Sequence, residues 1–397
     1  MATINRRQFL VSGMAGVGLV QSQQKPVNEK AIATATEDAT PRIAIVLSSF
    51  GGSSDHDGTR IRGLPDPRPV DAHLEYAHLD AMVGKAIELG APRKGGLASI
   101  VGPEDWVVIK PDISSCRGLT PVWSPGTVTD LRIIQSLVCF LMENKCGKRI
   151  TIAEGAADWL PVERSGKSVD GWTTDWGGAF GGLSYKKMVA DFSRRWPYIR
   201  FELLDLNFAD CLELPVPRRV YPAGTHPVTY FVPKVIQQCD KLLSVAPLET
   251  DAGTGVSLSV KNYFGIAPGM KYGMPKRGLD RLGDPNEVAV DLFNFHPADY
   301  AVVGGSWGFE ANLSGSPAGA TVHHNVIVAG ANAVAVDAIG AAIMGFDPAE
   351  LLYLQKMERR GFGVSDIDVI WTRGNDVDEA KRNFRRPAAW RAGRNKG

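Results

Sequence analysis

Short apolar runs alternate with amphipathic segments along most of the chain. Segments with apolar residues at helical spacing lie at 71–90, behind Thr127, near 185–195 and at 333–345. Strands that alternate with helices form a parallel or mixed sheet with helices on both faces, so the pattern predicts the α/β class. The apolar runs that we interpret as strands are 42–50, 106–113, 150–155, 201–207, 226–232, 241–247, 300–305, 321–330 and 367–372.

Polar residues sharpen several helix boundaries. Thr127 begins a T-V-T-D capping box, and Asn332 is placed to cap the helix that follows it. Residues 347–350, D-P-A-E, combine an N-cap, a proline at the first helical position and an acid at the third. We therefore expect another helix from here to Gly361.

The alternation is interrupted at residues 156–200, which hold four tryptophans and a glycine-rich run. Such a segment predicts an elaborated loop, and the tryptophans either pack a satellite cluster or form a ligand-stacking rim. The last residues are strongly basic and are expected to be frayed and solvated. The predicted organisation is a leader and linker at 1–40, a domain at 41–375 that contains this insertion, and a basic tail at 376–397.

The first residues resemble a twin-arginine export signal. Arg6 and Arg7 precede a weakly apolar run that ends near Val20 and is too short to span a bilayer. We expect export by the twin-arginine machinery, a periplasmic or extracytoplasmic location, and no transmembrane anchor in the mature chain. A chance arginine pair at the start of the chain is the alternative.

Charge and cysteine content argue against several classes of protein. The 44 basic and 43 acidic residues nearly cancel, so no overall field favours nucleic acid or an anionic membrane. The five cysteines show no C-x-x-C spacing, which argues against a self-contained iron–sulfur cluster or zinc ribbon. The sequence has no P-loop, H-E-x-x-H, G-x-S-x-G or full G-x-G-x-x-G motif, so standard nucleotide and serine-hydrolase chemistry is not expected.

Charged residues gather where the predicted strands end, which is where open α/β sheets bind ligands. The run LSVKNYFG at 258–265 also resembles a buried strand, yet it contains Lys261. A buried ammonium without a partner costs several kcal/mol, so this lysine needs an anion. We predict a polar cleft formed by Lys110, Asp112, Glu154, Glu249, Asp251, Lys261 and Asn262.

Residue chemistry suggests a role for each candidate. Glu249 and Asp251 either neutralise Lys261 or bind a divalent metal. His323 and His324 point to opposite faces of a strand, so at most one of them is a metal ligand. The predicted catalytic residues are Lys110, Lys261, Asn262 and Glu154, and the predicted ligand-binding residues are Asp112, Thr250, Asp337 and Glu310. For Asp337, stabilisation by a helix N-terminus is a structural alternative.

Together these motifs resemble domain-of-unknown-function family 362. The runs WVVIKPDI, RITIAEG, KLLSVAPLETDAGTGVSLSVKNYFG and VIVAGANAVAVDAIGAAIMGFDP follow the family's order, and the resemblance spans residues 42–372. Some relatives carry a ferredoxin-like segment, but its cysteine array is missing from this sequence. Asp112 replaces the asparagine of a K-P-N motif, and residues 249–251 replace a Lys-Thr-His run. These changes make the cleft more acidic and favour a metal or a cationic group.

The family's function is largely undetermined, so three functional classes stay open. In the first, which leans towards an enzyme, Lys110 and Lys261 orient an anionic group of a small molecule while carboxylates act as acid and base or hold a divalent metal. The second is an oxidoreductase or electron-transfer component that is loaded with its cofactor before export. The third is a non-catalytic ligand-binding protein. The string DHDGTR at 55–60 hints at kinship with nickel-pincer racemases.

Overall fold

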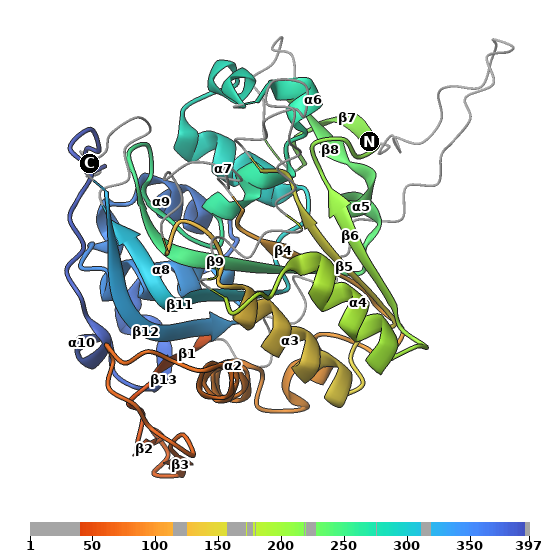
Figure 1. Cartoon of the computed structure of the whole chain (residues 1–397). Coiled ribbons are helices and arrows are strands. Elements are labelled where there is room, and N and C mark those ends of the chain that lie inside the picture. The colour runs from red at the N-terminus through yellow and green to blue at the C-terminus, as the bar shows by residue number, and fades with distance from the viewer. Residues whose placement is uncertain are drawn as a thin grey trace, which may run out of the picture. The chain divides into compact units, whose positions relative to one another are not determined.

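The computed structural model describes residues 40–113, 125–156, 172, 178, 180–217, 219, 228–274, 276–310 and 319–393. The predicted export signal, Cys116 and most of the tryptophan-rich insertion lie outside these residues. Residues 40–397 form one compact unit. Figure 1 shows this unit with its elements labelled.

In the described part of the chain, nine strands form one sheet with the order β13-β1-β12-β11-β9-β4-β5-β6, and β10 pairs with β9. β12 runs antiparallel to β1 and β11, whereas the other neighbours along this order are parallel, so the predicted mixed sheet is confirmed. The strands are β1 (Arg42–Leu47), β4 (Trp106–Pro111), β5 (Arg149–Glu154), β6 (Arg200–Asp205), β9 (Lys241–Asp251), β10 (Gly255–Ser257), β11 (Tyr300–Glu310), β12 (Ala320–Gly330) and β13 (Trp371–Gly374).

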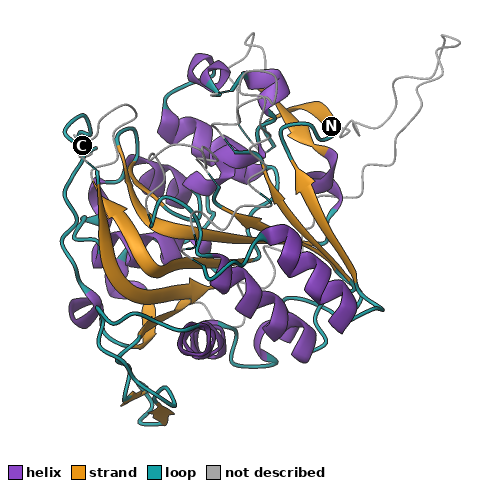
Figure 2. Cartoon of the chain, viewed as in Figure 1, coloured by secondary structure: helices purple, strands orange, loops and turns teal. Residues whose placement is uncertain are grey.

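Helices cover both faces of the sheet, as Figure 2 shows. One face packs against α2 (Tyr76–Gly90), α3 (Leu131–Glu143) and α4 (Tyr185–Arg195). The other packs against α7 (Pro285–Asn294), α8 (Ala333–Ile343) and α9 (Leu352–Arg359).

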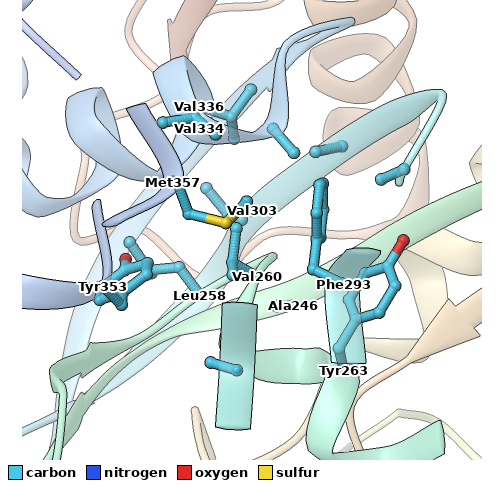
Figure 3. Close-up of a cluster of buried hydrophobic side chains, with 14 of the residues drawn as sticks. Ala246, Leu258, Val260, Tyr263, Phe293, Val303, Val334, Val336, Tyr353 and Met357 are labelled. Carbon is cyan, nitrogen blue, oxygen red and sulfur yellow. The ribbon is translucent and has the colours of Figure 1, made fainter. Parts of the chain in front are cut away.

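Successive residues of the central strands alternate between these two cores, as the period of two in a strand requires. In β1, for example, Ile43 and Ile45 belong to the core with α8, and Ala44 and Val46 to the core with α2. Part of the α8 core is drawn in Figure 3, where Val334 and Val336 lie above Val303.

Short elements complete the described fold. Two small antiparallel pairs are separate from the main sheet. They are β2 (Gly52–Ser54) with β3 (Arg60–Arg62), and β7 (Cys211–Pro215) with β8 (Thr229–Pro233). The remaining helices are α5 (Lys234–Gln238), α6 (Gly269–Tyr272) and α10 (Val377–Ala380), and the 3₁₀ turns are η2 (Gly96–Ser99), η4 (Lys261–Ile266), η5 (Arg277–Arg281), η6 (Pro348–Glu350) and η7 (Ile367–Val369). None of the described helices has the length and apolar character needed to cross a membrane.

The structure differs from the sequence-based prediction at four places along the chain. Asp130, and not Thr127, caps α3, because its carboxylate accepts from the Arg132 amide at 3.0 Å. The D-P-A-E segment forms only the η6 turn before α9 begins at Leu352. Asp366 accepts from the Asp368 amide at 3.0 Å and caps η7, so the last strand is limited to β13. The predicted strand at 258–265 is instead the 3₁₀ helix η4 with the residues that lead into it.

The basic tail is packed as far as it is described, which contradicts the expectation of a frayed and solvated segment. Phe384 and Trp390 are buried. The ring of Trp390 lies 5.4 Å from that of Phe346, which follows α8, in an edge-on arrangement. Apolar burial of two aromatic side chains outweighs the solvation of the tail's basic groups, which stay at the surface.

The described tryptophans of the insertion favour packing over a ligand-stacking rim. Trp172 is buried and meets Tyr185 edge-on at 5.3 Å. Trp196 packs against Phe192 at 5.8 Å between ring centroids. Both residues therefore belong to the core on the α4 face.

Candidate functional site

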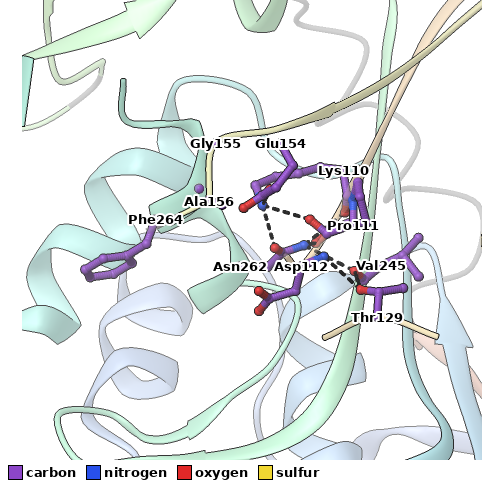
Figure 4. Close-up of polar contacts among 12 residues, drawn as sticks. Lys110, Pro111, Asp112, Thr129, Glu154, Gly155, Ala156, Val245, Asn262 and Phe264 are labelled. Carbon is purple, nitrogen blue, oxygen red and sulfur yellow. Dashed lines mark hydrogen bonds and ion pairs between the residues drawn. The ribbon is translucent and has the colours of Figure 1, made fainter. Parts of the chain in front are cut away.

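Three parallel strands deliver polar residues to the same edge of the sheet. Lys110 lies near the end of β4, Glu154 ends β5, and Asn262 is in η4, which follows the β9–β10 hairpin. Because β4 is parallel to both β5 and β9, their carboxyl ends meet at one edge. Figure 4 shows the three side chains converging there, with Asp112 close by.

The Lys110 ammonium is fully buried and has a partner for each of its three protons. It donates to the Pro111 carbonyl at 3.1 Å and to Asn262 Oδ1 at 2.5 Å. Its third partner is the Glu154 carboxylate, with which it forms a buried ion pair (Figure 4). A fully partnered charge of this kind can persist in an apolar interior.

A chain of hydrogen bonds fixes Asn262 so that its oxygen faces Lys110. The amide nitrogen of Asn262 donates to the Lys110 carbonyl and to Ser244 Oγ, both at 3.0 Å. Ser244 in turn donates to the Ser259 carbonyl at 2.9 Å. β9 therefore positions Asn262 through Ser244, which explains a polar residue in the middle of that apolar strand.

Gly265 lets the backbone of η4 close over the ion pair. A Cβ at this position would collide with the Glu154 carboxylate and with Lys110 Nζ. Any side chain here would displace one of the two charged groups. This close approach is a physical reason for the glycine at the end of the N-Y-F-G run.

Lys276 is a further member of the site that no sequence pattern indicates. It is 8% exposed, and its ammonium donates to the carbonyls of Gly155 at 2.5 Å, Gly265 at 3.1 Å and Phe264 at 3.2 Å. The surrounding sequence, M-P-K-R-G, has no apolar pattern that would signal a buried lysine. Only the folded chain places it beside Glu154.

The pKa values of Glu154 and Lys276 are shifted in opposite directions and become similar. Burial raises the pKa of Glu154 to about 7, against the stabilising charges of Lys110 and Lys276 and with repulsion from Asp112. Burial also lowers the pKa of Lys276 to about 7, while Glu154 acts in the opposite direction. Both groups therefore titrate near neutral pH.

Asp112 is held beside this pair by its backbone. Its amide donates to Thr129 Oγ1 at 2.8 Å, and its carbonyl accepts from the Thr129 amide at 2.9 Å. Thr129 Oγ1 also donates to the Val245 carbonyl at 2.8 Å, which ties the segment to β9. The charge of Asp112 favours the protonated forms of Glu154 and Lys276.

Lys261 does not join the Lys110 group. Its Nζ lies 3.3 Å from Asp251 Oδ2 and 4.2 Å from the centroid of the Phe264 ring. Asp251, one of the two carboxylates predicted as its partner, is thus the anion that pairs with Lys261, and the lysine is only partly buried. Burial raises the pKa of Asp251, but Lys261 and hydrogen bonds from Thr254 and Gly253 outweigh this effect and hold that pKa below its usual value.

Glu249 and Asp251 were predicted to bind a divalent metal, but no third ligating side chain joins them among the described residues. Among the described residues, no group of three or more His, Cys, Asp or Glu side chains is placed to hold a metal ion. Asp251 Oδ1 already accepts from the Gly253 amide at 2.9 Å and from the Thr254 amide and hydroxyl at 2.8 Å. Glu249 and Thr250 are buried on β9, where they pair with β10. Their metal and ligand roles remain predictions.

Asp337 accepts hydrogen bonds that give it a structural role, and its ligand-binding role stays a prediction. Its carboxylate accepts from the amides of Ser259 at 2.9 Å and Val260 at 3.1 Å, from Ser259 Oγ at 2.5 Å and from the Tyr353 hydroxyl at 3.1 Å. Burial raises its pKa to about 6 despite these four donors. The carboxylate therefore anchors the turn that leads into η4 and leaves little capacity for a ligand.

Glu310 and the two histidines also have structural partners. Glu310 accepts from the side chain of Arg385 at 2.7 Å and from its amide at 2.8 Å, so it fastens the C-terminal tail. A ring nitrogen of His324 lies 2.7 Å from the Ala380 carbonyl, and burial lowers the pKa of His324 to about 4. The His323 ring stacks on Trp307 with 6.2 Å between centroids.

A cavity of about 830 Å³ lies away from the Lys110 group, beside the ends of β1 and β13. Its lining includes Asp55 and His56 of the DHDGTR string, together with Arg373. Arg373 is already neutralised by Asp55 at 2.7 Å. The cavity and the Lys110 group are therefore two separate candidate sites. The Lys110 group is the stronger candidate, because buried groups with shifted pKa values are typical of functional sites.

Comparisons with known proteins place the chain in a family without assigning an activity. No curated protein matches it. Among solved structures, the lactate racemase apoprotein from Thermoanaerobacterium thermosaccharolyticum matches with a TM-score of 0.28 and 15% identity, over 57% of this chain and 48% of that one. This chain thus spans about half the length of that protein, and we draw no functional inference from the likeness. The family described as Domain of unknown function (DUF362) matches residues 107–342, which include every residue of the Lys110 group. The chain belongs to the DUF362 family.

Proposed function

We propose that the chain binds a small anionic molecule where β4, β5 and β9 end, and that Glu154 and Lys276 exchange protons as it binds. The observation that carries this proposal is one buried carboxylate that is ion-paired with one lysine and lies within the electrostatic range of a second buried lysine. Glu154 is paired with Lys110, and Lys276 is close enough to influence its pKa. Few structural ion pairs require such an arrangement, because a single lysine would neutralise the carboxylate.

Protonation of Glu154 is the step that prepares the site. When Glu154 takes up a proton, Lys110 loses its counter-charge but remains buried. An anionic group of a ligand then supplies the missing charge, as the general rule for buried ammonium groups requires. Ligand binding should therefore be accompanied by proton uptake near neutral pH.

The same two groups suit general acid and base catalysis. A catalytic acid or base works best when its pKa lies near the operating pH, and burial brings Glu154 and Lys276 into that range. In this proposal Lys110 and Asn262 orient the ligand, and Glu154 and Lys276 move protons. An enzyme that performs a proton transfer on a small carboxylate or phosphate is the resulting hypothesis.

Calorimetric titration of the purified chain with acetate, succinate and inorganic phosphate at pH 6 and pH 8 tests the proposal. We expect at least one anion to bind more tightly at pH 6, where Glu154 is protonated. Lys110→Met should abolish that binding. Glu154→Gln, which removes the competing charge but keeps the shape, should make binding at pH 8 resemble that at pH 6.

Lys356→Met is a matched control. Lys356 also pairs with a glutamate, Glu287 at 2.6 Å, but it lies in α9 and outside the Lys110 group. Its variant should bind the anion as the wild type does. Unchanged binding by a folded Lys110→Met protein, or failure of all three anions to bind the wild type, would contradict the proposal.

Export by the twin-arginine machinery is a separate proposal, supported by the Arg6-Arg7 pair and the short apolar run behind it. Replacement of both arginines by lysine should trap the chain in the cytoplasm of a producing bacterium. Fractionation and immunoblotting would measure this. Equal periplasmic amounts of wild type and variant would overturn the proposal.

A further inference from the structure

Cys239, His296 and Asp299 form a polar row at the edge of the sheet opposite to the Lys110 group. Cys239 precedes β9 and Asp299 precedes β11, so both lie where these parallel strands begin. Cys239 Sγ is 3.6 Å from His296 Nδ1, and His296 Nε2 is 3.5 Å from Asp299 Oδ2. A nucleophile, a base and an orienting acid in this order are the parts of an activated thiol.

Both ring nitrogens of His296 face acceptors. Nδ1 lies 2.7 Å from the Ile236 carbonyl, and Nε2 faces the Asp299 carboxylate. A neutral imidazole carries one N–H, whereas an imidazolium carries two. The doubly protonated ring is therefore the form that fits this geometry. Burial acts to lower the pKa of His296, but the charges and hydrogen bonds of Cys239 and Asp299 outweigh it and raise that pKa well above its usual value.

The surrounding structure holds the histidine and the aspartate in place. Asp299 accepts from the Leu242 amide at 2.8 Å, and its other oxygen lies 3.3 Å from Lys241 Nζ. The Tyr263 hydroxyl donates to the His296 carbonyl at 2.8 Å. Tyr263 packs against Phe293, with 4.8 Å between ring centroids, and both are drawn in Figure 3. Lys241, Asp299 and the Tyr263 phenol are thus titratable groups of the described chain that lie near the histidine and the thiol.

Other described cysteines have different surroundings and serve as internal references. Burial and the Asp105 charge raise the pKa of the fully buried Cys146. Burial also raises the pKa of Cys139, although Arg195 lies 3.8 Å from its sulfur. Cys239 differs because its sulfur lies 3.6 Å from a ring nitrogen of His296, besides a contact with the Ile236 carbonyl at 3.7 Å, and 7% of the residue is exposed to solvent.

We propose that Cys239 is a nucleophilic thiolate paired with the His296 imidazolium, and that it is a modification site for hydrogen peroxide and similarly compact electrophiles. In the reaction with peroxide, the thiolate sulfur attacks one peroxide oxygen. The S–O bond forms while the O–O bond breaks, and the departing hydroxide takes a proton from His296 to become water. Sulfur loses two electrons to the peroxide, and the product is a sulfenic acid.

Labelling of the purified full-length chain with iodoacetamide, followed by peptide mass spectrometry, tests the thiolate. At pH 6 the thiolate fraction of an ordinary thiol is small, so Cys239 should react about tenfold faster than Cys139 or Cys146. In His296→Asn this advantage should disappear at pH 6 and return as the pH approaches 9. Asp299→Asn is a second variant for the case in which His296→Asn does not fold, and it should reduce the advantage in part.

Peroxide treatment followed by dimedone, a reagent that traps sulfenic acids, tests the oxidation. Dimedone should label the Cys239 peptide in the wild type and not in Cys239→Ser. The proposal would be overturned if Cys239 of the folded wild type reacted no faster than Cys146 at pH 6. It would equally be overturned if folded His296→Asn kept the wild-type rate, or if dimedone left the Cys239 peptide unlabelled.

Discussion

Two groups of buried charges in this domain differ in the kind of cation they use. Between α7 and α9, the carboxylates of Glu287 and Asp291 meet Arg219, Arg360 and Lys356. At the sheet edge, Glu154 meets only lysines among the described ion pairs, Lys110 directly and Lys276 nearby. Arginine stays charged in proteins, whereas a buried lysine can lose its proton.

The difference in cations changes how the carboxylates titrate. Burial raises the pKa of Glu287, but a hydrogen bond from Lys356 and the charges of Arg360 and Lys356 outweigh it and leave that pKa below its usual value. In contrast, burial prevails at Glu154 and brings its pKa to about 7. Within the helix network, burial also raises the pKa of Asp291, against the hydrogen bond and charge of Arg360 and the charge of Arg219. The contrast with the sheet edge therefore lies in Glu287 and in the two arginines, which stay charged and suit a structural role. The sheet-edge group can change its charge near neutral pH, as a functional site requires.

Asp291→Ala should have the largest effect on stability, because it removes the carboxylate that two arginines of the helix network share. Asp291 is fully buried and accepts from Arg219 at 2.5 Å and from Arg360 at 2.8 Å. Removal of one partner of a buried pair costs about 3–5 kcal/mol. Denaturant unfolding measures the change in the free energy of unfolding. Asp366→Ala, at the exposed cap of η7, is the control for the removal of one negative charge elsewhere in the chain. A cost below about 1 kcal/mol would show that solvent already reaches the network.

Gly265→Ala tests the sheet-edge group in the same way, and its effect should be the second largest. The added methyl group would collide with both members of the Lys110–Glu154 pair. Overpacking of a tight site typically costs about 1–3 kcal/mol. The cost should fall in Gly265→Ala combined with Glu154→Ala, which removes one of the colliding groups. Additive effects of the two substitutions in a double-mutant cycle would show that η4 does not press on the pair.

The stability of the domain should depend on pH around neutrality because of Glu154 and Lys276. Glu154 has a raised pKa in the folded state, so its contribution is complete below about pH 4.5 and is lost as the pH rises through 7. Lys276 has a lowered pKa, so its contribution is complete above about pH 10.5 and is lost as the pH falls through 7. The two together predict a local minimum of stability near pH 7.

Urea unfolding from pH 5 to pH 10 would measure this minimum, which should be on the order of 1–3 kcal/mol deep. Glu154→Gln with Lys276→Met should flatten it, because neither replacement side chain titrates. If the depth were the same in the double variant, the minimum would come from other groups.

Lys261→Met should have the smallest effect of this series. Its pair with Asp251 is partly exposed, with 15% of the lysine and 26% of the aspartate side chain accessible. Pairs at such sites contribute about 0.2–1 kcal/mol, and the contact with Phe264 adds a similar amount. Thermal unfolding with added salt would measure it, because salt should reduce the difference between wild type and variant. A loss above about 3 kcal/mol would mean that the pair is shielded from water.

The predicted strands and helices were largely confirmed, because the period of the apolar residues reflects which side of each element is buried in the fold. The sequence also led to Lys110, Glu154 and Asn262, since charged or polar residues at the ends of apolar runs have few structural explanations. It was wrong about the local structure at Lys261, whose neighbours suggested a strand, although one of the two carboxylates predicted as its partner does pair with it. The turn into η4 depends on the carboxylate of Asp337, which is 76 residues further along the chain than Lys261 and which no local pattern connects to it.

Lys276 shows a second limit of sequence-based prediction. It is buried by contacts with three carbonyl groups, two in η4 and one after β5, and not by apolar neighbours in its own segment. Backbone carbonyls leave no mark on a sequence, so only the folded chain could reveal this residue. The basic tail was misjudged for a related reason, since two aromatic side chains among many arginines decide its packing.

A direct measurement of Glu154 tests the central claim of this account, that the sheet-edge group titrates near neutral pH. NMR of protein with ¹³C-labelled glutamate side chains would follow its carboxyl resonance from pH 4 to pH 9, with Glu154→Gln to assign the signal. We predict a midpoint near pH 7, in agreement with the pKa of about 7 that burial gives this group. A midpoint below about pH 5 would show that Glu154 is an ordinary structural partner of Lys110 and would contradict the proposed function.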